Sequence, residues 1–172
     1  MRMQLTDLAS IPHLASENLG ALDRRPFTGV SSDSRDVKAG NVFFALRGES
    51  FDGHAFVTKA FESGASCAVV DGRADRTAYR DRPHLVVSDT TRALGDLAAL
   101  YRGKFSIPVI AIAGSNGKTT TKEMTTKVLA AKYSVHSTQG NLNNHIGVPR
   151  TIFGLSTLHE AATACAPLTA YH

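Results

Sequence analysis

Apolar positions along the chain alternate between short continuous runs and runs with spacings of three and four, which predicts strands followed by helices. Two β-favouring runs occupy residues 27–30 and 42–46. From residue 54 to residue 63 the apolar side chains recur with helical spacing, and Gly64 is well placed to end that helix. A further apolar run at 65–70 predicts a buried strand.

The same alternation continues in the second half of the chain. A short apolar run at 85–87 is followed by a helical pattern, which Asp89 or Thr90 can cap. A continuous apolar run at 109–113 is typical of a strand buried in a parallel sheet, and helical spacing resumes after Lys118. This order of strands and helices predicts an α/β fold.

A polar, charged stretch at 71–83 interrupts the pattern and is the expected boundary between two domains, 1–84 and 85–172. With 172 residues, the chain is long enough for one ordinary domain or for a small domain with part of another. Its 42% hydrophobic and 20% charged residues are typical of a globular protein. Because no apolar run approaches the roughly 18 residues of a membrane span, we expect a cytoplasmic location.

Charge and cysteine content narrow the classes of ligand. The formal net charge is +4, but the basic residues form neither a run nor a stripe, so small anionic ligands are favoured over nucleic acid. The two cysteines, Cys67 and Cys165, are too few and too far apart for a disulfide framework or a zinc site. Cys67 lies in an apolar run and is expected to be a core thiol.

The strongest chemical signal is a glycine-containing turn between the apolar run at 109–113 and the following helix, with the residues Gly114, Ser115, Asn116, Gly117, Lys118, Thr119 and Thr120. Backbone N–H groups at a helix start lack intrahelical partners, and a polyphosphate satisfies them. Lys118 is then expected to reach the β- and γ-phosphates, and the Thr119 hydroxyl to bind Mg²⁺. Ile112 stands where the longer phosphate-loop pattern has glycine, so the match is to a shorter form of that pattern. The alternative to a phosphate-binding loop is a glycine turn that binds no ligand.

This short loop, with Asn116 between the glycines and a threonine pair after the lysine, resembles the ATP loop of Mur ligases. Three further stretches resemble the same family: Asp33-Ser34-Arg35 followed by the glycine-to-glycine segment 40–48, Phe51-Asp52-Gly53-His54-Ala55-Phe56, and the asparagine-rich segment 140–149. The resemblance covers about residues 4–158.

The resemblance implies the N-terminal portion of such a ligase: a small α/β uridine-nucleotide-binding domain, followed by the beginning of a P-loop parallel-sheet ATPase domain. It also implies an ATP- and Mg²⁺-dependent ligation in peptidoglycan synthesis through an acyl phosphate. Segment 140–149 and Lys122-Glu123-Met124 are most similar to the branch that adds D-alanyl-D-alanine to UDP-N-acetylmuramoyl-tripeptide. Another branch, adding diaminopimelate or lysine, and a non-catalytic nucleotide-binding module remain alternatives.

The resemblance further implies individual roles. Lys118 is the expected catalytic residue, Ser34 and Arg35 are expected to contact the UDP-muramoyl substrate, and three amides are expected near the phosphates: Asn141, Asn143 and Asn144. Each has a simpler interpretation, because Asp33-Ser34-Arg35 can be a polar turn and the asparagines can be turn formers. Asp52-Gly53-His54 can likewise be a helix start capped by Asp52.

The resemblance ends at about residue 160, where an Ala- and Thr-rich stretch follows. We interpret this tail as unmatched and the chain as a truncated or frame-shifted reading of a longer gene, inactive as a ligase by itself. Residues 85–172 are expected to be marginally stable alone, because a partial parallel sheet exposes strand edges. A small kinase is a further alternative, but the sequence shows no convincing second strand ending in a metal-binding Asp.

Overall fold

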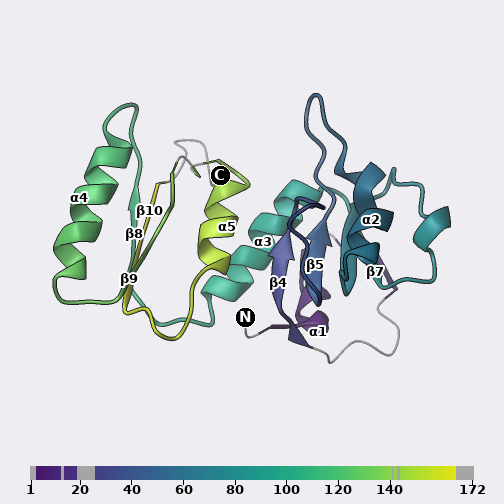
Figure 1. Cartoon of the computed structure of the whole chain (residues 1–172), viewed down its shortest axis with the longest axis horizontal. Coiled ribbons are helices and arrows are strands. Elements are labelled where there is room, and N and C mark those ends of the chain that lie inside the picture. The colour runs from purple at the N-terminus through teal and green to yellow at the C-terminus, as the bar shows by residue number, and fades with distance from the viewer. Residues whose placement is uncertain (1–2, 13, 19–25, 141, 143, 166–172) are drawn as a thin grey trace. The chain divides into compact units, whose positions relative to one another are not determined.

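The computed structural model describes residues 3–12, 14–18, 26–140, 142 and 144–165, and it divides the chain into two compact units, Met1–Leu97 and Ala98–His172 (Figure 1). Both units combine parallel strands with helices, so the predicted α/β fold is confirmed. In the described part of the chain, no helix is long and apolar enough to cross a membrane.

The first unit is built on a five-stranded sheet. The strands, in their order across the sheet, are β2 (Leu14–Asn18), β7 (His84–Val87), β6 (Cys67–Asp71), β5 (Asn41–Phe44) and β4 (Gly29–Ser31). The four strands β4 to β7 are parallel, and β2 pairs antiparallel with β7 at one edge. A separate antiparallel pair, β1 (Met3–Gln4) with β3 (Pro26–Phe27), adjoins the short helix α1 (Leu5–Leu8).

Continuous apolar runs form the central strands because both faces of the sheet are buried there. Every residue of β5, β6 and β7 is buried, including Cys67, so the predicted core thiol is confirmed. The predicted helix after residue 53 is a 3₁₀ turn, η2 (Gly53–Phe56), continued by α2 (Val57–Glu62), whose apolar side packs on the sheet. Gly64 follows α2 with φ +99, a left-handed conformation that suits glycine at a helix end.

The domain boundary expected at residue 84 needs correction. That residue begins β7, which lies between β6 and β2 and pairs with both. The polar stretch before it is also part of the unit, because its 3₁₀ turn η3 (Thr77–Tyr79) buries Tyr79 in the core. The chain therefore divides at Leu97, inside helix α3 (Thr90–Arg102).

The second unit has a three-stranded parallel sheet in the order β8 (Val109–Ile112), β10 (Ala161–Cys165) and β9 (Val135–Ser137). Helices α4 (Lys118–Ala130) and α5 (Gly147–Phe153) lie on opposite sides of this sheet (Figure 1). The predicted passage from an apolar strand through a glycine turn to a helix is confirmed by β8 and α4.

Two expectations about this unit are wrong. The run at 109–113 was expected to be buried, but β8 lies at the sheet edge and Val109 is 40% exposed. The stretch after residue 160 was expected to be unmatched, but residues 161–165 form the central strand β10. Small Ala and Thr side chains suit that position, because β10 is packed between two strands and both helices, and Ala161, Ala162 and Thr163 are buried.

The position of β7 predicts which shortened chain can fold. Burying Leu85, Val86 and Val87 contributes roughly 1.5–3 kcal/mol per side chain, comparable in sum to the whole stability of a small domain. A chain ending at residue 83 is therefore expected to lack cooperative urea unfolding by circular dichroism, whereas one ending at residue 102 retains it. Cooperative unfolding of the shorter chain would contradict the assignment of β7 to this unit.

Candidate functional site

The glycine turn before α4 has the backbone geometry of an anion-binding loop. Gly117 precedes the first helical residue with φ +75 and ψ −2, a left-handed conformation that costs glycine little. Among the described residues, no side chain caps this helix start. The amides in the first turn of α4, which a helix does not pair internally, and the positive end of its dipole are suited to a negatively charged ligand.

Lys118 holds its ammonium over the same turn. Its Nζ donates to the carbonyl of Gly114 at 2.5 Å and lies 3.4 Å from the carbonyl of Ser115. The loop residues Ser115 to Gly117 and the following Thr119 and Thr120 are exposed. The exposed turn thus carries backbone amides, a lysine and a threonine hydroxyl within a few residues, which is the donor set that a nucleotide polyphosphate with Mg²⁺ requires. The described residues contain no cluster of three His, Cys, Asp or Glu side chains for a separate metal site.

The asparagine segment after β9 is described at Asn144, whereas Asn141 and Asn143 lie outside the described residues. The Asn144 side-chain oxygen accepts hydrogen bonds from the amides of Ile146 at 3.2 Å and Gly147 at 2.7 Å. These contacts cap the start of α5, so the turn-forming interpretation describes this side chain.

A buried lysine in α4 was not singled out from the sequence as part of a site. Lys122 is 1% exposed, and its Nζ donates to the carbonyl of Thr138 and pairs with Glu123 Oε1 at 2.8 Å. Lysine is rarely buried to this extent. The sequence alone does not reveal the burial of Lys122, because lysine is common at exposed helix positions.

The polar turn after β4 places Ser34 and Arg35 differently. Ser34 is buried, whereas the Arg35 side chain is 80% exposed and pairs with Asp33 Oδ2 at 2.5 Å. The Asp33 carboxylate also accepts the Arg35 amide at 3.0 Å. The turn is therefore held by its own aspartate, and it presents a guanidinium to solvent beside a sheltered hydroxyl.

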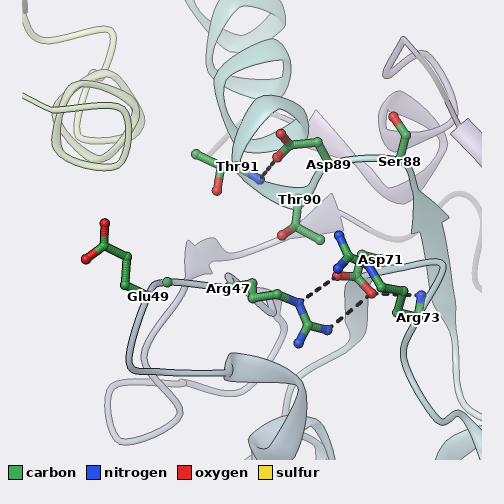
Figure 2. Close-up of a pocket in the computed structure, with 9 residues that line it drawn as sticks. Arg47, Glu49, Asp71, Arg73, Ser88, Asp89, Thr90 and Thr91 are labelled. Atoms are coloured by element: carbon green, nitrogen blue, oxygen red, sulfur yellow. Dashed lines mark hydrogen bonds and ion pairs between the residues drawn. The ribbon is translucent and has the colours of Figure 1, made fainter.

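A cavity of about 490 Å³ opens at the carboxyl ends of the neighbouring strands in the first unit (Figure 2). Its lining comes from the turns after three strands: Arg47 to Glu49 after β5, Asp71 and Arg73 after β6, and Ser88 to Thr91 after β7. The last group includes the start of α3, where Asp89 accepts the amides of Thr91 and Arg92. The predicted Asp89 cap is thereby confirmed.

Arg47 is fixed at this cavity by two carboxylates. Its Nε donates to Asp71 Oδ2 at 3.1 Å, and its Nη1 pairs with Asp52. His54 contacts the same two residues: its Nδ1 lies 2.6 Å from the Asp52 carboxylate oxygen Oδ1, and its Nε2 accepts the backbone amide of Asp71 at 3.0 Å. The Asp52-Gly53-His54 stretch is thus a helix start and also the support of Arg47.

Charge around Asp71 determines its protonation. Burial raises the pKa of the Asp71 carboxyl, but hydrogen bonds from Arg47 and the Arg73 amide and the nearby charges outweigh burial and hold that pKa below its usual value. The carboxylate is therefore ionised near neutral pH, and the guanidinium beside it keeps its geometry.

Comparisons with known proteins agree with this combination of fold and loop. The model described as Mur ligase family, catalytic domain, matches residues 26–102, and the model described as Mur ligase middle domain matches residues 112–165. The second match also includes β10, which corrects the expected end of the resemblance at about residue 160. The chain belongs to the Mur ligase family.

Individual relatives share one printed name, UDP-N-acetylmuramoyl-tripeptide--D-alanyl-D-alanine ligase. The protein from Synechocystis sp. is 44% identical over 133 residues, which is 77% of this chain and 29% of that protein. The protein from Bacillus subtilis is 42% identical over 134 residues, 78% of this chain and 29% of that protein. The chain thus spans less than a third of the length of these relatives.

Solved structures give the same likeness. Crystal structure I of MurF from Acinetobacter baumannii matches with a TM-score of 0.84 and 34% identity, over 95% of this chain and 35% of that one. The MurF ligase from Thermotoga maritima in complex with ADP matches with a TM-score of 0.71 and 34% identity, over 80% of this chain and 32% of that one.

The lowered pKa of Asp71 predicts how acid affects the first unit. Because that pKa is lower in the folded state than in the unfolded state, the stabilisation is present at neutral pH and is lost as the pH falls from about 5 through the folded value. Asp71→Asn is expected to lower the free energy of unfolding by about 1–2 kcal/mol at pH 7 and to flatten its decline in acid.

Urea titrations at pH 7 and pH 3.5, followed by the NMR signals of β6, measure this effect. Asp81→Asn is the matched control, because the Asp81 side chain is 95% exposed. Equal acid sensitivity in the Asp71→Asn variant and the unaltered chain would count against the role of this carboxylate.

Proposed function

We propose that the chain provides the ATP loop and the UDP-substrate-binding portion of a ligase that adds D-alanyl-D-alanine to UDP-N-acetylmuramoyl-tripeptide in peptidoglycan synthesis. The observation that carries the proposal is the start of α4, where Gly117 leaves backbone amides uncapped and Lys118 lies over the turn. Similarity to relatives of that printed name at 44% and 42% identity supports the choice of branch.

In the proposed reaction, the terminal carboxylate of the muramoyl tripeptide attacks the γ-phosphorus of ATP, which gives an acyl phosphate and ADP. The amine of D-alanyl-D-alanine then attacks the acyl carbon and expels phosphate. Lys118 and the amides of α4 stabilise the negative charge that builds up on the transferred phosphoryl group. Mg²⁺, held by the Thr119 hydroxyl, supplies further charge neutralisation when bound.

The uridine end of the substrate is proposed to bind the first unit. Ser34 is sheltered in its turn and offers a hydroxyl to a phosphate or uracil oxygen, while Arg35 adds a charged donor from the exposed side. Arg47 extends the proposed donor set, because its guanidinium lines the large cavity at the same edge of the sheet. Among the asparagines after β9, Asn144 is proposed to contribute indirectly, by accepting the amides at the start of α5 and so fixing that helix start.

A branch that adds diaminopimelate is less well supported. A solved structure named UDP-N-acetylmuramoyl-L-alanyl-D-glutamate--2,6-diaminopimelate ligase matches at 18% identity, which shows a shared fold alone. A non-catalytic nucleotide-binding module is the second candidate, because the same loop would bind a nucleotide with or without turnover. Binding measurements test the loop under both candidates.

The loop assignment predicts a loss of ATP binding in one variant. Lys118→Ala is expected to weaken ATP affinity by about 100-fold, because it removes the ammonium that neutralises the terminal phosphates. Isothermal calorimetry with ATP and Mg²⁺ measures this change. Lys127→Ala, an exposed lysine on the same helix, is the control and should bind ATP like the unaltered chain. Unchanged affinity in a folded Lys118→Ala variant would falsify the proposal.

Binding at the two units is expected to be separable. Ser34→Ala should weaken UDP-N-acetylmuramoyl-tripeptide affinity by about ten-fold, through one lost hydrogen bond to a charged group, and leave ATP affinity unchanged. Calorimetry with each ligand alone measures both affinities, and Ser63→Ala, at the exposed end of α2, is the control. A kinase would ignore the muramoyl ligand, so an absence of its binding to the unaltered chain would contradict the substrate assignment.

A further inference from the structure

Lys122 is a charged side chain inside the second unit for which the loop chemistry gives no role. It is 1% exposed, and its ammonium contacts the carbonyl of Thr138 and the carboxylate of Glu123. Burying an ammonium is costly, and a well-packed apolar side chain of similar volume is often as stable or more so. Stability alone therefore gives no reason for a lysine at this position.

The residue that Lys122 holds is the first one after β9. The Thr138 amide donates to the carbonyl of Thr163 in the central strand β10 at 3.1 Å, and its hydroxyl accepts from Thr151 of α5 at 3.3 Å. Thr138, Thr151 and Thr163 are all buried. Lys122 completes this polar layer from the α4 side, so Thr138 is held through its amide, its hydroxyl and its carbonyl.

Parallel pairing puts this layer at the same edge of the sheet as the phosphate loop, with β10 between the two strands that lead to them. Because β8, β9 and β10 run in the same direction, their carboxyl ends lie at one edge of the sheet. The phosphate loop follows β8 at that edge, and Thr138 follows β9 at the same edge. Lys122 lies one helical turn after Lys118 on the same face of α4, so it connects the phosphate-loop helix with the connection that follows β9.

We propose that Lys122 is a positioning residue that ties the Thr138–Gly140 connection to the phosphate-loop helix α4, so that this connection meets the terminal phosphate of ATP. The proposal rests on the proposed function, in which the loop binds ATP. The loop amides and Lys118 contact the β- and γ-phosphates from the side of α4, and the connection after β9 would add a contact to the γ-phosphate from another strand end at the same edge of the sheet. Loops at such positions order around a γ-phosphate and relax without it.

The distinguishing measurement is affinity for ATP compared with affinity for ADP. Lys122→Met keeps a long unbranched side chain but removes the charge and the donor to Thr138. It is expected to weaken ATP binding by about ten-fold and to change ADP binding by less than about two-fold. Lys122→Arg keeps a charged donor and is expected to recover most of the loss, whereas Lys127→Met should change neither affinity.

If Lys122 merely supports the fold, its substitution would lower the affinities for ATP and ADP together, and that result overturns the proposal. So does an unchanged ratio of the two affinities in a folded Lys122→Met variant. If the unaltered chain binds neither nucleotide, the proposed function itself fails. If it binds both and only the ratio stays constant, the role of Lys122 fails alone.

Hydrogen exchange in the unaltered chain provides a second test that does not depend on whether a variant folds. The amides of Thr138, Gln139 and Gly140 are expected to gain protection with ATP and Mg²⁺ but not with ADP and Mg²⁺. Protection that is equal with the two nucleotides, or absent with both while ATP is bound, overturns the proposal.

Discussion

The backbone amides at the start of α4 are the constraint on which the second unit depends. The first amides of a helix have no partner within the helix, and here the residue before the helix is a glycine, which offers no side chain to accept them. The same turn requires φ +75, which few other residues adopt without strain. Geometry and chemistry therefore favour the same sequence, a glycine followed by a lysine, at the end of an apolar strand.

Both units place their polar groups by the same rule. In a parallel sheet the turns after the strands all meet at one edge, so residues distant in the sequence come together there. In the first unit this brings Arg47, Asp71 and the start of α3 around one cavity. In the second unit it brings Thr138 to the same sheet edge as the turn that holds Lys118. The central strands consist mainly of buried apolar residues, and they align the turns that hold the polar groups.

Much of the local structure could be predicted because its causes are local. Helical spacing, a capping aspartate at position 89 and a left-handed glycine at position 64 each act within a few residues of the sequence. The failures concern long-range pairing. The place of β7 inside the first sheet depends on β2, which lies far away in sequence, and a polar stretch before β7 imitates a linker.

The candidate site shows the same contrast between features with local causes and features that depend on long-range contacts. The glycine turn before α4 could be predicted directly, because the proposed phosphate-binding residues lie within seven consecutive positions. Whether β8 is exposed depends on which strand takes the central position of the sheet, and that strand is β10. The Ala- and Thr-rich sequence of β10 gives only a weak signal for a strand. Likewise, the burial of Lys122 and the clamp of Asp52, His54 and Asp71 around Arg47 arise from contacts between separate elements.

The strand order β8-β10-β9 has a consequence for how the second unit is made on the ribosome. Its two outer strands do not pair with each other in this sheet, and the strand that joins them comes last among the described strands. The sheet therefore cannot form until β10 has left the exit tunnel, and until then β8 and β9 lack their partner strand. Such late, non-local closure is slow and leaves strand edges of the nascent chain exposed in the meantime.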